Sequence, residues 1–104
     1  MNQRRAAIAE ALAVLAPAIP AFDREAVLDL AEDSPGLRSG SPQAAAWLAL
    51  TSHVRHRYSE YDQLLADGYD RDAARHFCAE AMVVTLREWG AAPTLVGRIL
   101  DLRD

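Results

Sequence analysis

The sequence contains no lysine and only one cysteine, and each shortage narrows the kinds of protein that it can encode. The lone Cys78 excludes an intrachain disulfide and any zinc site built from several cysteines. We therefore expect a reducing, cytoplasmic setting. All 11 basic residues are arginines, whose guanidinium groups can bind a carboxylate or a phosphate through two parallel hydrogen bonds.

Long apolar runs are missing as well. No stretch approaches the roughly 18 apolar residues that a membrane span needs, so we expect no membrane partner. Residues 6–19 follow an arginine pair and faintly resemble a secretory leader. Glu10 interrupts that run, and Ile8, Leu12 and Leu15 recur at helical spacing, which favours an amphipathic first helix instead.

An excess of basic charge is also absent, since the formal net charge is −4. A protein whose whole surface binds nucleic acid carries a net positive field, so that class is disfavoured, although a local basic patch is compatible with the sequence. The 104 residues suffice for one core, and 51% hydrophobic with 25% charged residues is typical of a globular chain. We expect a single helical domain over residues 1–104.

Helical spacing recurs along the whole chain, and no run alternates with a period of two. Ser41 and Asp70 are suited to begin helices, because their side chains can accept hydrogen bonds from the first free backbone N–H groups. The pattern predicts an all-α fold, a small bundle of about five helices. These are residues 2–16, 21–32, 42–67, 71–89 and a short helix that begins at Pro93.

The long helix expected at residues 42–67 organises this prediction. Apolar residues between Trp47 and Leu65 stay on one face, which favours one continuous helix. A rival interpretation breaks the helix at Ser59, whose spacing to Asp62 imitates a capping box. The short connection to residues 71–89 predicts that the two helices pack as an antiparallel hairpin.

Two histidine–glutamate pairs would face each other across that hairpin and could form a metal site. The pairs are His56 with Glu60 and His76 with Glu80. Two imidazoles and two carboxylates on facing helices can bind zinc or a similar divalent ion. Such pairs are also common on helix surfaces, so a metal-dependent enzyme or metal-binding protein is the least favoured hypothesis. We predict no cofactor.

Asp62 offers a structural interpretation of the same segment. Arg55 lies on the same expected helix, and Arg75 can reach back from the following one. We expect both guanidinium groups to clasp the Asp62 carboxylate in a partly buried ion network that fixes the register of the hairpin.

The arginines of this segment also support a functional interpretation, in which they hold a phosphate or carboxylate and a tyrosine supplies a stacking face. Acidic neighbours offset their charge, so nucleic acid is not the favoured ligand. No catalytic residue is predicted, because Ser59 near His56 lacks a glycine-rich elbow and oxyanion donors. The candidate ligand-binding residues are Arg55, His56, Tyr58, Tyr61, Asp62, Arg71 and Arg75.

The segment resembles a family of small helical domains of unknown function. Its pattern has an Arg-His pair, a Thr or Ser, Tyr-Asp, Leu-Leu, a Gly, an Arg and an Ala-Arg pair. The matching positions here are Arg55, His56, Ser59, Tyr61, Asp62, Leu64, Leu65, Gly68, Arg71, Ala74 and Arg75. The resemblance covers about a quarter of the chain, has Ser59 where threonine is more usual, and implies no activity.

The sequence therefore favours a non-enzymatic binding or protein-interaction module, with self-association through an exposed apolar first helix as one route to a partner. The alternative is a nucleic-acid or phosphate-ligand binder. That alternative would use Arg55, Arg57, Arg71 and Arg75.

Overall fold

The computed structural model describes residues 2–37 and 39–101. Within these ranges the chain forms α-helices, one short 3-10 helix and no strand, so the all-α class is confirmed. The elements are α1 (Gln3–Leu15), α2 (Ala21–Asp33), η1 (Pro35–Leu37), α3 (Pro42–Tyr58), α4 (Tyr61–Ala66), α5 (Arg71–Glu88) and α6 (Pro93–Asp101).

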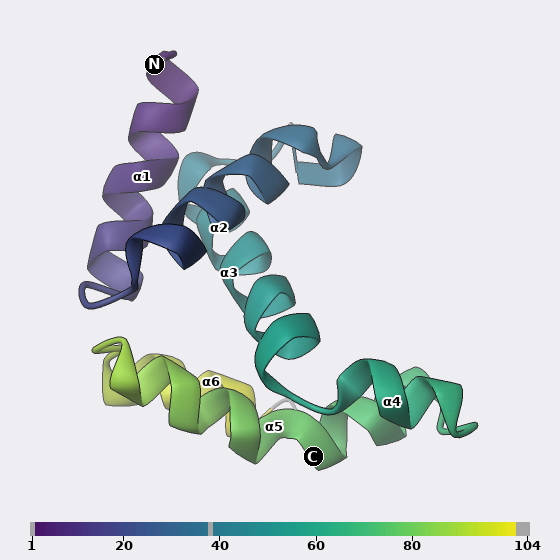
Figure 1. Cartoon of the computed structure of the whole chain (residues 1–104). Helices are drawn as coiled ribbons and strands as arrows, with labels where there is room; N and C mark the ends of the chain where they lie inside the picture. The colour runs from purple at the N-terminus through teal and green to yellow at the C-terminus, as the bar shows by residue number, and fades with distance from the viewer. Residues whose placement is uncertain (1, 38, 102–104) are drawn as a thin grey trace.

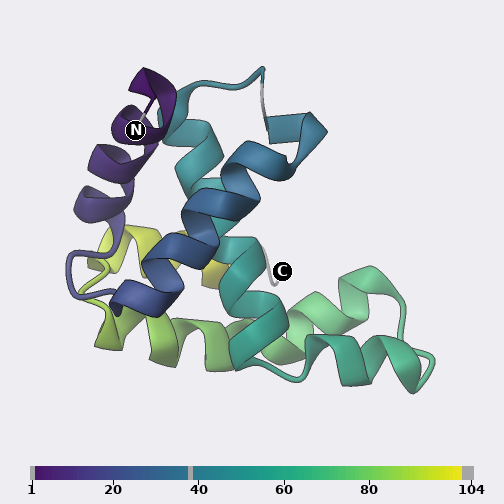
Figure 2. The same ribbon diagram turned by 45° about the horizontal axis from the view of Figure 1, so that its top comes forward.

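The helices form two groups that meet where α3 reaches α5 (Figure 1). In the first group, α1 and α2 both pack against α3. In the second, α4 and α6 pack against α5, and the turned view shows α4 lying beside the first part of α5 (Figure 2). The buried apolar side chains of both groups belong to one cluster, which includes Leu12, Val27, Leu50 and Leu86.

Side-chain caps fix the predicted starts of three helices. The Asn2 Oδ1 accepts a hydrogen bond from the Arg5 N–H, and the Ser41 Oγ accepts one from the Ala44 N–H. In the same way Asp70 begins α5. Each cap satisfies a backbone donor that has no partner inside its helix.

The continuous helix expected at residues 42–67 is wrong, because the chain leaves helical geometry at Ser59 and Glu60. The Ser59 hydroxyl donates to the Arg55 carbonyl oxygen, which would otherwise lack a partner at the end of α3. The Ser59 Oγ in turn accepts a hydrogen bond of 3.2 Å from the Tyr61 N–H at the start of α4. The Ser59 side chain thus forms hydrogen bonds with the end of α3 and with the start of α4. The break lies at Ser59, as the rival interpretation predicted.

The break changes which helices form the hairpin. Only the six-residue α4 runs back along α5, whereas α3 points away from it (Figures 1 and 2). Gly68, with φ of 101°, allows the tight turn between α4 and Tyr69. The residues at the end of α3 therefore lie at a three-way junction between α3, α4 and α5.

A second junction joins the two groups at the other end of α5. Gly90 ends that helix with φ of 84°, and the Trp89 carbonyl accepts a 2.8 Å hydrogen bond from the Ala18 N–H after α1. A Cβ at Gly90 would lie 3.0 Å from the Pro17 Cγ, whereas a Cβ at Gly68 would meet nothing within 4 Å. The turn at Gly90 is therefore crowded, whereas the turn at Gly68 is open.

We predict that Gly90→Ala lowers the free energy of unfolding more than Gly68→Ala does. Both substitutions force a side chain into the left-handed region, at a cost of about 1–2 kcal/mol. Only Gly90→Ala adds a clash with Pro17. Urea unfolding of both variants measures the difference, and equal costs would show that Pro17 does not constrain this turn.

Candidate functional site

The last turn of α3 carries three basic side chains in a row, Arg55, His56 and Arg57. The C-terminal end of a helix bears a partial negative charge, which favours cations there. The helices α4 and α5 approach this end, and α2 packs along α3, so four helices lie around the last turns of α3 (Figure 1).

On the α2 side, a buried carboxylate collects two hydrogen bonds. Asp23 is 3% exposed, and its Oδ1 lies 2.8 Å from the His53 Nε2 and 2.7 Å from the Tyr58 hydroxyl. A carboxylate only accepts, so the Nε2 of His53 carries the hydrogen. The rings of His53 and Tyr58 both contact Trp89 from the end of α5. These contacts fix α2 and α5 to α3.

The hydrogen bonds from His53 and Tyr58 also favour the ionised form of the Asp23 carboxyl group. Burial alone would raise the pKa of the Asp23 carboxyl, but the hydrogen bonds from His53 and Tyr58 outweigh it, so its pKa lies below the ordinary value. The Tyr58 phenol has a raised pKa, first because it donates to Asp23 and second because it loses contact with water. Both shifts favour a carboxylate that accepts from a neutral phenol.

Sequence reasoning missed this cluster. Tyr58 was predicted as a stacking face for a ligand, and the structure adds that its hydroxyl donates to Asp23. Asp23 carried the weak signal of an acid in the first turn of a helix, which the helix dipole already explains. Its partner lies 30 residues away, and no local spacing reveals such a pairing.

The prediction that Arg55 and Arg75 both bind the Asp62 carboxylate is also wrong. The Asp62 Oδ1 lies 2.6 Å from the His56 Nδ1, and within residues 39–101 and 2–37 it makes no ion pair with Arg55 or Arg75. The Asp62 side chain is 63% exposed. The break at Ser59 turns α4 so that Asp62 faces the imidazole one helical turn before the break.

Arg55 is consequently left without a carboxylate in the described part of the chain. Its side chain is partly buried, and its guanidinium lies 5.7 Å from the centroid of the buried Tyr61 ring. Burial lowers the pKa of Arg55, and the nearby positive charge of Arg75 lowers it further. Two like charges are therefore close together, one of them partly withdrawn from water.

A shallow hollow of about 590 Å³ opens on the other side of the same turn. It brings together two imidazoles, of which His53 is held by Asp23 and His56 by Asp62. The five residues that line it are Leu30, Ser52, His53, His56 and Arg57.

The remaining candidates do not converge. Arg71 is the first residue of α5 and is exposed, and His76 and Glu80 are exposed farther along that helix. Within the described ranges, no three His, Cys, Asp or Glu side chains are placed to hold a metal ion together. The expected set of His56, Glu60, His76 and Glu80 required one straight hairpin, which the break at Ser59 prevents.

Comparison with models of known protein families shows where this chain belongs. A model of the family DUF2293, described as an uncharacterized conserved protein, matches residues 11–90. The segment from Arg55 to Arg75 lies inside the match, which agrees with its resemblance to a family of unknown function. Searches of curated proteins and of solved structures returned no match. No helix in the described ranges is long and apolar enough to cross a membrane.

We predict that Asp23→Ala lowers the free energy of unfolding at pH 7 by about 2–3 kcal/mol, because two donors lose a charged acceptor. The folded pKa of Asp23 lies below its unfolded value of about 3.9. Its stabilisation is therefore present above that value and is lost as the pH falls through the folded pKa. Urea unfolding at pH 7 and near pH 3 measures both effects.

Asp33→Ala is the matched control for this prediction, because Asp33 is an exposed aspartate at the end of the same helix. It should change stability little at either pH. An equal loss in both variants at pH 7 would contradict an anchoring role for Asp23.

Proposed function

This chain belongs to the DUF2293 family of uncharacterized conserved proteins, and we propose that it is a non-enzymatic binding module that holds an anionic group between Arg55 and Arg75. Phosphate is the class of ligand that suits two neighbouring guanidinium groups, because each can donate two parallel hydrogen bonds to its oxygens.

The proposal rests on Arg55, which has no carboxylate partner among residues 2–37 and 39–101. A partly buried guanidinium normally has a carboxylate or several carbonyl oxygens as partners, because burying a charge without one is costly. Here the carboxylate that the sequence offered, Asp62, is engaged by His56. A bound anion would supply the acceptor that Arg55 lacks and would relieve its repulsion with Arg75.

The surroundings of Arg55 support a site that is formed before the ligand arrives. The buried Tyr61 ring lies under the guanidinium, and the edge of the His56 imidazole packs against the same ring at a centroid distance of 5.2 Å. An arginine that rests on an aromatic face loses fewer conformations when it binds, which favours affinity.

A discrete anionic group fits the charge of the chain better than a long polyanion does. The net charge is −4, and Asp70 and Asp72 flank Arg71 at the start of α5. These carboxylates would repel the successive phosphates of a nucleic acid that ran past Arg75. The proposal therefore favours a single phosphate over extended nucleic-acid binding.

Nothing near Arg55 supports a chemical step. The Ser59 hydroxyl is committed to the break between α3 and α4, and Cys78 is buried with its thiol directed at the Arg75 carbonyl oxygen. An activated nucleophile needs an adjacent base that can take its proton, and neither group is hydrogen-bonded to one in the described part of the chain. Binding is the simpler function for this arrangement.

We predict that Arg55→Gln and Arg75→Gln each weaken the binding of inorganic phosphate by about 10- to 100-fold, the value of one hydrogen bond to a charged group. A titration followed by backbone amide NMR at constant ionic strength, with chloride as the reference, gives the affinity and the location. The amides that shift should lie around Arg55, Tyr61 and Arg75.

Arg87→Gln is the matched control, because Arg87 is an exposed arginine on the same helix as Arg75, three turns farther along. It should leave phosphate binding unchanged. An equal loss in this variant, or no shift specific to phosphate in the wild-type chain, would refute the site.

The thermal stability of the protein without ligand provides a second test of the anion site. Because Arg75 lowers the pKa of Arg55 by repulsion, Arg75→Gln should raise the thermal midpoint slightly in low-salt buffer without phosphate. A residue retained for stability would show the opposite sign. The midpoint of wild type should approach that of the variant as phosphate is added.

A further inference from the structure

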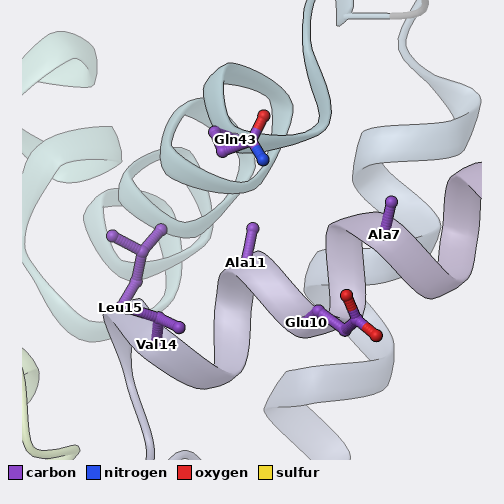
Figure 3. Close-up of a pocket in the computed structure, with 6 residues that line it drawn as sticks. All are labelled: Ala7, Glu10, Ala11, Val14, Leu15 and Gln43. Atoms are coloured by element: carbon purple, nitrogen blue, oxygen red, sulfur yellow. The ribbon is translucent and has the colours of Figure 1, made fainter.

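An apolar groove runs between α1 and the start of α3, on the side of α1 that faces away from α2 (Figure 3). Its volume is about 340 Å³. Val14 stands at its edge with 80% of its surface exposed, more than any other large apolar side chain in the described ranges. The lining residues are Ala7, Glu10, Ala11, Val14, Leu15 and Gln43.

The groove is formed by small residues on a helix that is held rigidly from behind. Ile8 and Leu12 of α1 are fully buried against the core. On the same side, Arg5 makes ion pairs of 2.8–3.0 Å with Glu25, Asp29 and Glu32 of α2. The adjacent face of α1 carries Ala7 and Ala11, whose side chains are too short to fill the space beside α3. Because α1 is fixed, the groove cannot close by movement of this helix alone.

The charge of the groove indicates what covers it. Glu10 is the only ionisable residue in the lining, and it makes no hydrogen bond or ion pair with any described residue. Figure 3 shows its carboxylate at the rim beside the apolar floor. A partner that buries Val14 and Ala11 would bring a basic side chain within reach of this carboxylate.

We propose that this groove binds an amphipathic helix of a partner protein, with apolar side chains against Val14 and Ala11 and a lysine or arginine against Glu10. A groove between two helices accepts the side-chain ridges of a third, and anchors at every third and fourth position match its length along α1. This surface lies on α1, so it is separate from the anion site at the end of α3.

A second copy of this chain is the less suitable occupant. Antiparallel packing of α1 against α1 of a copy would place the twofold axis near Ala11. The two Glu10 carboxylates would then approach each other with no basic residue in the lining to offset them. Arg4 would not offset this repulsion, because its guanidinium donates a hydrogen bond of 2.7 Å to the Leu37 carbonyl oxygen. Charge complementarity thus favours a basic partner helix.

The test uses two labelled synthetic helices, followed by fluorescence anisotropy against the whole protein. Both carry leucines at helical spacing; one has arginines beside them and the other has glutamates. Wild type should bind the arginine peptide about two- to fivefold more tightly, the effect of one surface ion pair. Glu10→Arg should reverse that preference. Val14→Asp should weaken both peptides at least tenfold.

Val84→Asp is the matched control, since Val84 is an exposed valine on α5, far from the groove. It should bind both peptides as wild type does, and circular dichroism verifies that every variant is folded. Equal binding of the two peptides by wild type, or equal loss in both aspartate variants, would overturn the proposal. So would a wild-type dimer in light scattering that Val14→Asp dissociates, because the occupant would then be a second copy.

Discussion

The arrangement of the site depends on the two hydrogen bonds that the Ser59 hydroxyl makes. By donating to the Arg55 carbonyl and accepting from the Tyr61 N–H, it replaces two hydrogen bonds that a continuous helix would make with its own backbone. The chain can therefore change direction between α3 and α4 without leaving buried backbone groups unpaired. This change brings Asp62 to His56 and leaves Arg55 without the acceptor that lies only seven residues away.

Two carboxylate–imidazole pairs then define the opposite sides of the last turns of α3. Asp23 is buried and holds His53, which ties α2 to α3, whereas Asp62 is exposed and holds His56. In both pairs the carboxylate fixes which ring nitrogen bears the hydrogen. The polar groups of the hollow that both imidazoles line are therefore already oriented. The pairs differ in burial: the buried pair lies inside the first helix group, whereas the exposed pair links α3 of the first group to α4 of the second.

The sequence predicted what local patterns determine and failed where the outcome depends on tertiary contacts. The helix starts at Ser41 and Asp70 were correct because a cap and its donor are three residues apart. The continuity of residues 42–67 was wrong because the apolar stripe continues through the break, so periodicity cannot detect it. The partner of Asp62 was wrong for the same reason, since its geometry follows from the direction of α4. Asp23 and His53 could not be paired at all from spacing.

Arg55 has no carboxylate partner in the described ranges and lies near the like charge of Arg75, which is unusual enough to need a reason, because other arginines of the chain do find partners. Arg5 has three carboxylate partners on α2, and Arg57 and Arg98 rest on the rings of Phe22 and Trp47. Arg55 likewise rests on the Tyr61 ring but, in the described ranges, has no carboxylate partner such as those of Arg5. The fold retains the repulsion between Arg55 and Arg75, which a structure built for stability alone would remove by a single substitution on an exposed surface. Local destabilisation of this kind is characteristic of sites that are completed by a ligand, because the same repulsion becomes attraction when an anion lies between the charges.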